Sequence, residues 1–319
     1  MASLFQITVE TQETDLSEAG TESVDSLPFP FNQQTFCRYE PIEKTIDTAR
    51  VLIVDNLLRD EGDLSEIARA DWGKEVSTHL KRERRIAQLA LQNIVSNVQR
   101  LVKEPRTQVV HVSAVAEAVD SFRPDAIVLS GTLRDFDYYK PEILSSFSNF
   151  IQNTPVPVLG ICGGHQLIGL SFGVRVVTLD SQEQRARRDN RITEYQYRLV
   201  RIVDPADPIF QQIDNPQSGL WQDYTKEGRI LRVWQNHGLQ LDRLPAGFKL
   251  LATSYLCRNQ MMVRRSGNQL IYSVQFHLEK SFEDWNKSRT RWEHPNESRD
   301  GRVLFENFLR LALEHPATS

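Results

Sequence analysis

The sequence predicts an α/β fold in which a mostly parallel sheet is covered by helices on both faces. Between residue 50 and residue 173, short apolar runs alternate with segments of helical periodicity, and such alternation is typical of parallel sheets. The runs are apolar at nearly every position, which fits strands that are buried on both faces. The 319 residues, 40% hydrophobic and 25% charged, have ordinary globular composition and suffice for one large domain or two small ones.

The first strand is predicted at 50–56, in “RVLIVDN”. A long helical stretch follows at about 64–103, where apolar residues recur at spacings of four and three and form one stripe. The residues of this stripe are Ile86, Ala90, Ile94, Val98 and Leu101. The basic run “KRERR” at 81–85 lies in the same helical pattern, so we expect it to form a solvated face.

Strands and helices continue to alternate as far as Gly173, which stands where a helix would end. The expected order is a strand at 107–113, a helix at 114–122, a strand at 125–131, a helix at 141–153, a strand at 156–161 and a helix at 165–172. Ligands bind at the carboxyl ends of parallel strands, and three candidate positions fall there: Asp55-Asn56, Ser130-Gly131 and Cys162. The region after Gly173 is rich in predicted strands, and an amphipathic helix is expected at 301–315.

Charge and cysteine content exclude several classes of protein. A net charge of −4 gives no basic surface for nucleic acid, and no run of about 18 apolar residues could span a membrane. Cys37, Cys162 and Cys257 lack the spacing of a disulfide framework or zinc cluster, which favours a reducing compartment. The N-terminus has neither a signal-peptide layout nor the arginines of a transit peptide, so the cytoplasm is the expected location. Nothing in the sequence indicates a metal or an organic cofactor.

The N-terminal 48 residues differ in character from the rest of the chain. No Lys or Arg precedes Arg38, whereas the same segment holds Glu10, Glu13, Asp15, Glu18, Glu22 and Asp25. We therefore expect residues 1–48 to form a flexible acidic extension, or an arm laid on a partner, ahead of a domain at 49–315.

The segment Gly160-Ile161-Cys162-Gly163-Gly164 places a cysteine between glycines at the end of a predicted strand. This G-x-C-x-G pattern is the thiol counterpart of a nucleophile elbow, where a strained turn needs neighbours without side chains. The turn would place Cys162 at a helix N-terminus, where the helix dipole favours a thiolate. A small buried cysteine in a glycine-rich turn remains the alternative on these five residues alone.

A thiol nucleophile needs a base, and the base usually needs an orienting acid. Among seven histidines, His277 stands out because “LIYSVQFHLE” ends in His-x-Glu. Residues two apart on a strand point the same way, so we expect Glu279 to hold the ring of His277.

Taken together, these features resemble the class I glutamine amidotransferase family, whose members hydrolyse glutamine to glutamate and ammonia. Four segments carry the resemblance in the family's order: “VLIVDN”, “DAIVLSG”, “PVLGICGGHQLIGLSFG” and “VQFHLE”. “WQNHGLQLDRLPAGFKLLATS” matches a fifth segment, and “LFENFL” is similar to the terminal helix. The resemblance runs from about Val51 to Leu313 and implies a flavodoxin-like, three-layer αβα fold.

The resemblance implies a role for each matching residue. Cys162 would attack the side-chain carbonyl of glutamine to give a γ-glutamyl thioester, His277 would act as general base and then acid, and Glu279 would orient it. The backbone N–H groups of Thr132 and Gly163 would form the oxyanion hole. The implied substrate contacts are Gln166, Asn236, Gly238 and Leu239. Two neighbouring histidines, His165 and His237, are interpreted as structural.

Two residues depart from the family pattern in the segment “SGTLRDFDYY”. Thr132 replaces a glycine of the oxyanion loop, and Arg134 stands where another small residue is usual. Either this loop has a different shape, or its donor turns in when a partner docks. Leu278 replaces the usual proline between the histidine and the acid, which is a milder change.

Insertions relative to the family are expected near 57–103 and 280–301, where they would shape a substrate or docking surface or be mere decoration. The resemblance implies a glutaminase that supplies ammonia to a separate synthase subunit, because the first 48 residues are too few for a fused synthase. The alternatives are a hydrolase or transferase of a γ-glutamyl or other amide compound, and a catalytically silent regulatory subunit. Neither a nucleic acid nor a membrane is expected as a partner.

Overall fold

The computed structural model describes residues 43–186, 188–213, 230–280 and 299–316. Most of the acidic extension predicted at 1–48 and most of the insertion predicted near 280–301 therefore lie outside the described residues. The described residues belong to one compact unit that covers Glu40–Ser319.

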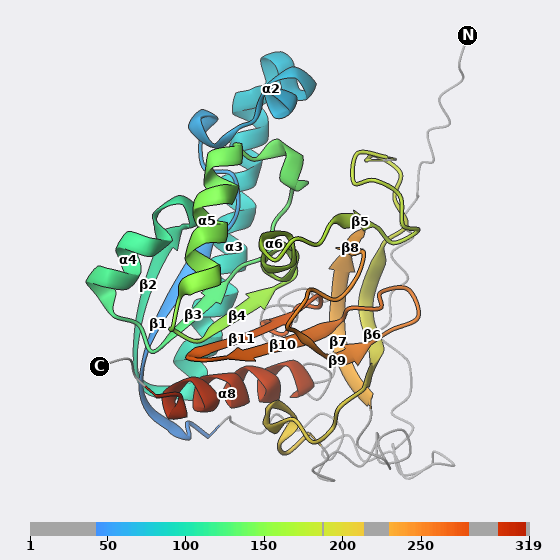
Figure 1. Cartoon of the computed structure of the whole chain (residues 1–319). Coiled ribbons are helices and arrows are strands. Elements are labelled where there is room, and N and C mark those ends of the chain that lie inside the picture. Colours follow the sequence, from blue (N-terminus) through green and yellow to red (C-terminus); the bar gives the residue numbers. More distant parts are fainter. Residues whose placement is uncertain (1–42, 187, 214–229, 281–298, 317–319) are drawn as a thin grey trace, which may run out of the picture. The chain divides into compact units, whose positions relative to one another are not determined.

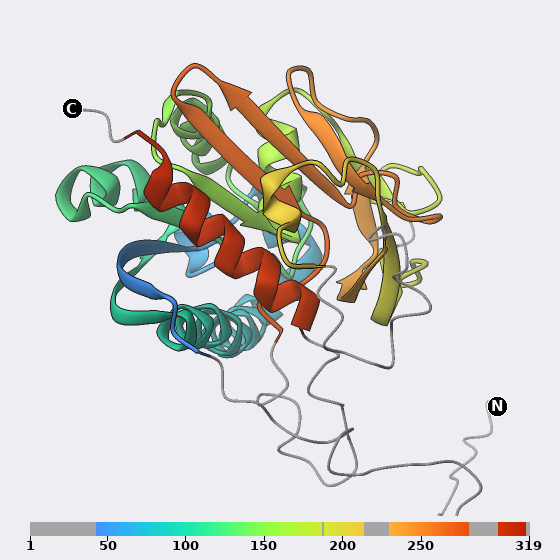
Figure 2. The same cartoon turned by 90° about the horizontal axis from the view of Figure 1, so that it is seen from below.

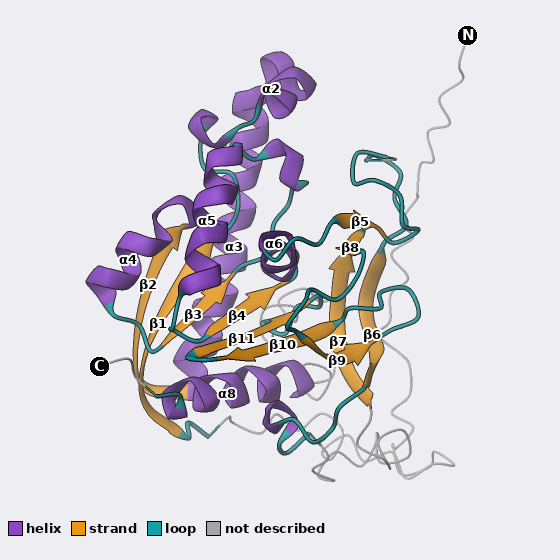
Figure 3. Ribbon diagram, in the orientation of Figure 1, coloured by secondary structure: helices purple, strands orange, loops and turns teal. Residues whose placement is uncertain are grey.

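A nine-stranded sheet forms the centre of this unit (Figures 1 and 3). Its strands, in spatial order, are β2 (Val102–His111), β1 (Ile46–Asp55), β3 (Ala126–Leu129), β4 (Val158–Ile161), β11 (Gln269–Val274), β10 (Met261–Ser266), β9 (Lys249–Thr253), β6 (Glu194–Ile202) and β7 (Ile230–His237). The first five strands are mutually parallel, and the remaining four continue the sheet in antiparallel pairs. A separate two-stranded ribbon pairs β5 (Val176–Thr178) with β8 (Leu239–Leu241).

Helices cover both faces of the parallel part, as the sequence predicts (Figure 2). They are α2 (Glu66–Trp72), α3 (Val76–Leu101), α4 (Val115–Phe122), α5 (Pro141–Asn153), α6 (Gly163–Ser171) and α8 (Arg299–Glu314). Helices α3 and α8 pack on one face, whereas α4, α5 and α6 pack on the other. No helix in the described ranges has the length and apolar character needed to cross a membrane.

Strand β1 shows why the central strands are apolar at every position. Val51 and Ile53 belong to the core beneath α3 and α8, and Leu52 and Val54 belong to the core beneath α4, α5 and α6. All four side chains are fully buried. Because successive side chains on a strand alternate between its faces, a strand covered by helices on both sides must be apolar throughout.

The strand register brings the candidate positions to one edge of the sheet. Val54 lies opposite Leu129, and Leu129 lies opposite Gly160. The residues that follow these positions, including Asp55, Ser130 and Cys162, therefore leave the sheet side by side. This confirms the prediction that they share the carboxyl edge.

Three element boundaries differ from the prediction. Strand β1 begins at Ile46 rather than residue 50, and β2 begins at Val102, inside the predicted helix. The helical stretch from 64 is divided by Gly73, whose positive φ of 50° ends α2 before α3 begins. The basic run at 81–85 is only partly a solvated face: Lys81, Arg82 and Arg85 are exposed, whereas Glu83 is buried and Arg84 is half-buried.

Candidate active site

Cys162 lies at the turn between β4 and α6, as the elbow motif predicts. Its backbone has φ 49° and ψ −103°, a conformation that L-residues rarely adopt and that is costly to hold. The turn is tied to the sheet because the Cys162 N–H donates to the carbonyl of Val274, 2.8 Å away. Cys162 immediately precedes the first turn of α6, so its sulfur lies at the positive end of a helix.

The glycines beside Cys162 are required by space as well as by backbone conformation. A Cβ on Gly160 would lie 2.6 Å from the side chain of Ile168 and 2.9 Å from the backbone of Gly164. A Cβ on Gly163 would lie 2.3 Å from the backbone nitrogen of Thr132. Helix α6 can therefore approach both β4 and the loop after β3 only because these positions lack side chains.

His277 and Glu279 form the expected pair, although not by the strand geometry that predicted it. Strand β11 ends at Val274, so His277 lies beyond it in an isolated bridge whose N–H donates to the carbonyl of Trp234. Glu279 lies in the following turn. The Nδ1 of His277 is nevertheless 2.7 Å from the Oε1 of Glu279.

The charges around His277 favour an imidazolium. Burial opposes the charge, but the carboxylate of Glu279 and the sulfur of Cys162 outweigh it and raise the pKa of His277 well above its ordinary value. His277 Cε1 also lies 3.6 Å from the position that a Cβ on Gly131 would take, and the Cβ of Cys162 is equally close to that position. The structure thus gathers Cys162, His277 and Glu279 under the loop that begins at Gly131.

The two predicted oxyanion donors lie next to each other. The backbone nitrogen and the Oγ1 of Thr132 both approach the α-carbon of Gly163, within 2.3 Å of where its missing Cβ would be. The nitrogen of Gly163 faces Gly131 at 3.9 Å from its Cβ direction. The replacement of a glycine by Thr132 is therefore compatible with a close approach to the elbow, because the space comes from Gly163.

The predicted substrate contacts are only partly brought together. The Nε2 of Gln166 donates to the carbonyl of Leu239 over 3.0 Å, which joins α6 to the segment after β7. Gly238 packs against 191–193, where a Cβ would lie 3.2 Å from the carbonyl of Ile192. Asn236 is exposed, and no contact between its side chain and the triad is found in the described part of the chain.

Gln275 is a site residue that the sequence reasoning missed. Its Nε2 lies 3.7 Å from the Sγ of Cys162, and its Oε1 accepts from Gln166 over 3.1 Å. Gln275 is fully buried. Its position two residues before His277 in “VQFHLE” was the available signal.

The other thiol and the neighbouring histidines have structural surroundings. Burial raises the pKa of Cys257 far above its ordinary value, so this thiol stays protonated. Burial lowers the pKa of His165 to about 3, and its Nδ1 lies 2.9 Å from the hydroxyl of Ser273. His237 lies between the carbonyl of Leu239 and the carboxylate of Glu194, 2.9 Å and 3.1 Å away.

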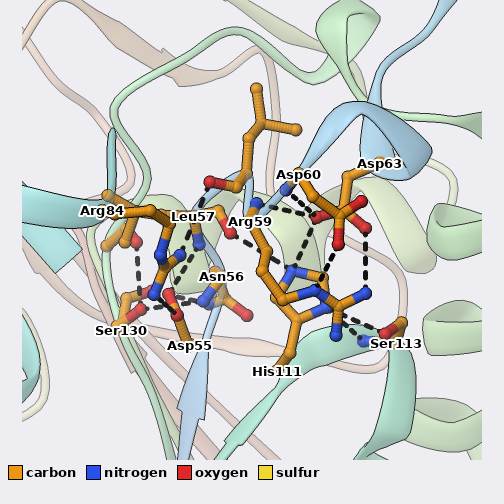
Figure 4. Close-up of polar contacts among 12 residues, drawn as sticks. Asp55, Asn56, Leu57, Arg59, Asp60, Asp63, Arg84, His111, Ser113 and Ser130 are labelled. Carbon is orange, nitrogen blue, oxygen red and sulfur yellow. Dashed lines mark hydrogen bonds and ion pairs between the residues drawn. The ribbon is translucent and has the colours of Figure 1, made fainter. Parts of the chain in front are cut away.

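A buried polar group supports the loop after β3 (Figure 4). The Nδ2 of Asn56 donates to the carbonyl of Ser130 over 2.6 Å, and the Asn56 N–H donates to the Ser130 hydroxyl over 3.0 Å. The hydroxyl of Tyr139 donates to the carbonyl of Asn56 over 2.7 Å. Asn56 therefore ties together the start and the end of the segment 130–139. Within the described ranges, no three His, Cys, Asp or Glu side chains gather closely enough to hold a metal ion.

Comparison with known proteins gives the chain a family. The family model described as “Glutamine amidotransferase class-I” matches residues 90–293. The glutamine-hydrolysing subunit of GMP synthase from Thermoplasma volcanium is 29% identical over 191 residues, which cover 60% of this chain and 73% of that protein. The same subunit of Thermococcus kodakarensis is 34% identical over 163 residues, 51% of this chain and 70% of that protein.

A solved structure shares the fold. The crystal structure of a protein from Thermoplasma acidophilum, described as a subunit of GMP synthase, superposes with a TM-score of 0.50 over 83% of this chain and 94% of that one, at 22% identity. The family match covers 204 of the 319 residues, counted from residue 90 to residue 293, and includes Cys162, His277 and Glu279. The chain belongs to the class-I glutamine amidotransferase family.

Proposed function

We propose that this chain hydrolyses the side-chain amide of glutamine through a Cys162-His277-Glu279 triad. The observation that carries the proposal is the placement of Cys162 on a strained turn at a helix N-terminus, beside a histidine whose Nδ1 is 2.7 Å from a buried carboxylate. These are the nucleophile, base and orienting acid that acyl transfer needs.

In the first half-reaction, the thiolate of Cys162 attacks the side-chain carbonyl carbon of glutamine. The negative charge that develops on the carbonyl oxygen would be stabilised by the N–H groups of Thr132 and Gly163. His277, kept protonated by its raised pKa, donates its proton to the amide nitrogen, since an amine leaves only when it is protonated. Ammonia departs and a γ-glutamyl thioester remains on Cys162.

In the second half-reaction, a water molecule attacks the thioester. His277, now neutral, takes a proton from this water, and the carbon–sulfur bond breaks as the carbonyl re-forms. Glutamate leaves, and the thiolate and the imidazolium are restored together. Glu279 keeps the Nδ1–H of His277 pointed at its carboxylate, so the opposite nitrogen faces the reacting atoms.

The amino acid end of glutamine would be held by Gln166, Asn236, Gly238 and Leu239. Gln166 and Leu239 already contact each other at the end of α6, which supports a shared binding surface. Gln275 lies between Gln166 and the Cys162 sulfur and would contact the reacting side chain.

We further propose that the ammonia goes to a separate synthase subunit. The relatives named above are glutamine-hydrolysing subunits of GMP synthase, which makes the synthase partner of such a protein the first candidate acceptor. A reducing compartment such as the cytoplasm suits a catalytic thiol, which disulfide formation would inactivate.

The test is glutamine turnover by the purified chain, alone and with a candidate synthase. Ammonia and glutamate should be released in equal amounts, and Cys162→Ala should abolish both. Mass spectrometry of a reaction stopped with acid should find the γ-glutamyl group on Cys162. Cys257→Ala is the matched control, because it removes the other described thiol and should leave turnover intact.

Three results would count against the proposal. If no candidate partner elicits turnover and Cys162 never becomes acylated, the chain is catalytically silent. If Cys162→Ala retains turnover, another nucleophile acts. If the enzyme cleaves larger γ-glutamyl amides in preference to glutamine, it is a hydrolase or transferase of those compounds.

A further inference from the structure

Helix α3 places two consecutive charged residues against the active-site edge of the sheet. Glu83 and Arg84 lie within the basic run at 81–85, and they are its two least exposed members. Each reaches a different segment of the carboxyl edge. Both residues precede the part of the chain that the family model matches, 90–293.

Glu83 holds the end of the loop that carries Thr132. Its Oε1 accepts from the Nε of Arg134 over 2.7 Å, and the carboxylate is fully buried. The guanidinium of Arg134 lies 5.2 Å from the centre of the Trp72 ring, on α2, a favourable arrangement of a cation over an aromatic face. Arg134, one of the two departures from the family pattern, thus has its partners in the crossover between β1 and β2.

Arg84 supports the start of the same loop. Its Nη2 lies 2.5 Å from the Oδ2 of Asp55, the last residue of β1. The next residue, Asn56, carries the two hydrogen bonds to Ser130 described above, and Figure 4 shows Arg84, Asp55, Asn56 and Ser130 in one group. The loop 131–133 is therefore bounded by Ser130 on one side and Arg134 on the other, and α3 supports both.

We propose that Glu83 and Arg84 act as a clamp that positions the oxyanion loop, with Arg134 and Asp55 as its two points of attachment. This proposal rests on the proposed function, since an oxyanion loop matters only for acyl transfer. Glu83 is a positioning residue that acts through Arg134, two residues after Thr132.

A clamp is needed because this loop lacks the small residues that the family pattern provides. Thr132 brings a bulky side chain against Gly163, where its Oγ1 would be 2.2 Å from an added Cβ. A small outward movement of the loop would relieve this crowding and carry the Thr132 N–H away from the developing charge. Oxyanion donors are effective only when they are held in place before the reaction, so a shift of about 1 Å is costly.

The experiment compares Glu83→Gln, Arg134→Met and the double variant with the wild-type chain, with glutamine as substrate. We expect kcat to fall by about 10- to 100-fold in all three variants, with KM changed by less than about threefold, because the donor acts on the transition state. The rate at which iodoacetamide alkylates Cys162 should stay within about twofold of wild type, since the thiolate and its base are untouched.

The double variant separates positioning from folding. Removing one partner of a buried ion pair leaves an uncompensated charge, whereas replacing both partners often restores stability. A purely structural pair would therefore regain kcat together with its melting temperature in the double variant. A positioning pair would regain the melting temperature and remain slow.

Asp207→Asn is the matched control. Asp207 is also a buried carboxylate paired with an arginine, 2.8 Å from Arg265. Arg265 lies opposite Leu270 at the start of β11, hence at the edge of the sheet opposite Cys162. This variant should lose stability and keep kcat within about twofold of wild type.

Hydrogen exchange gives a second readout that needs no turnover. In Glu83→Gln, the amides of 131–135 should exchange about tenfold faster than in wild type, whereas in Asp207→Asn they should not. If wild type never hydrolyses glutamine, the proposed function fails and exchange alone decides whether the clamp exists. Unchanged exchange at 131–135, or a wild-type kcat in Glu83→Gln, overturns the clamp.

Discussion

At the scale of single residues, Gly163 is the position where packing and chemistry coincide. It follows the nucleophile, offers one of the two proposed oxyanion N–H groups, and leaves room for Thr132. We expect Gly163→Ala to lower kcat for glutamine by about 10²–10³-fold, because its Cβ would push the Thr132 nitrogen out of the oxyanion hole. Steady-state kinetics with glutamine would measure this loss.

Gly267→Ala is the control for that variant. Gly267 also has a positive φ, 56°, but a Cβ there meets no atom within 4 Å. Its substitution should cost about 1–2 kcal/mol of stability from the backbone alone and leave kcat unchanged. Equal kcat values for the two variants would contradict the role of Gly163.

A second prediction at this scale concerns the proton on His277. The carboxylate of Glu279 helps to raise the pKa of His277, so His277 keeps the proton for ammonia up to alkaline pH. Glu279→Gln removes that negative charge, which lowers the pKa of His277 and moves the alkaline limb of the kcat profile to lower pH. We also expect kcat at its optimum to fall by about 10²–10⁴-fold, because the ring loses its orienting partner.

The measurement is kcat as a function of pH for both enzymes. Glu183→Gln is a suitable control, because Glu183 is an exposed carboxylate paired with Arg175 on the surface. Its profile should match that of wild type. An alkaline limb in Glu279→Gln that stays in place or moves to higher pH would exclude the proposed pairing.

The residues found from the sequence and those missed differ in what fixes them. Cys162, His277 and Glu279 lie within short motifs, so local spacing pointed to them. Glu83 and Gln275 act through contacts with distant segments, the first across 51 residues and the second across 113. A side chain whose partner is that remote has no local pattern, and Glu83 was hidden further by its basic neighbours.

At the scale of elements, α3 is attached to a third active-site segment through Asn97. The Nδ2 of this buried side chain donates to the carbonyl of Glu279 over 2.6 Å and to its own helix at Asn93. We expect Asn97→Leu to lower kcat by about tenfold, because the turn that presents Glu279 loses its anchor, and to cost about 1–3 kcal/mol from the unsatisfied carbonyl.

Asn307 on α8 provides the matched comparison. It is a buried helical asparagine that donates to two carbonyls, those of Ile209 and Gln211. Asn307→Leu should lose a similar amount of stability in a urea titration and retain full kcat. A fall in kcat of the same size in both variants would mean that general loosening, and not the position of Glu279, limits the reaction.

The types of the elements were predictable, whereas several boundaries were not. The buried strands and the stripe on α3 follow from apolar periodicity, and Gly173 ends α6 with a positive φ of 79° as expected. By contrast, “IDTAR” at the start of β1 and “VKEPR” at the start of β2 are polar, and the two segments become strands by pairing with each other. Pairing of this kind is a tertiary effect that a local pattern does not contain.

At the scale of the whole molecule, the parallel order β2-β1-β3-β4-β11 explains how the site assembles. The ends of β1, β3, β4 and β11 supply Asp55, Ser130, Cys162 and the segment that leads to His277. Helix α3 runs beneath this edge and contacts it through Glu83, Arg84 and Asn97. The site therefore depends on the long crossover between β1 and β2 as much as on the strands themselves.

The same dependence on burial predicts how the stability of the molecule varies with pH. His165 is fully buried in α6, and burial lowers its pKa to about 3, whereas an unfolded histidine titrates near about 6.5. Between these values the unfolded chain binds a proton that the folded chain excludes. His165 therefore causes stability to fall as the pH drops through this window, by up to about 1.4 kcal/mol per pH unit.

Urea titrations at several pH values between about 7 and about 4 would measure this slope. His165→Asn keeps a nitrogen that can reach the Ser273 hydroxyl and does not titrate, so its stability should depend less steeply on pH than that of wild type. His315→Asn, beyond α8, changes a half-buried histidine that contacts the carbonyl of Asn268 and should leave the slope nearly unchanged. If His165→Asn retains the wild-type slope, the acid sensitivity of the fold arises elsewhere, and the neutral His165 inside α6 does not contribute to it.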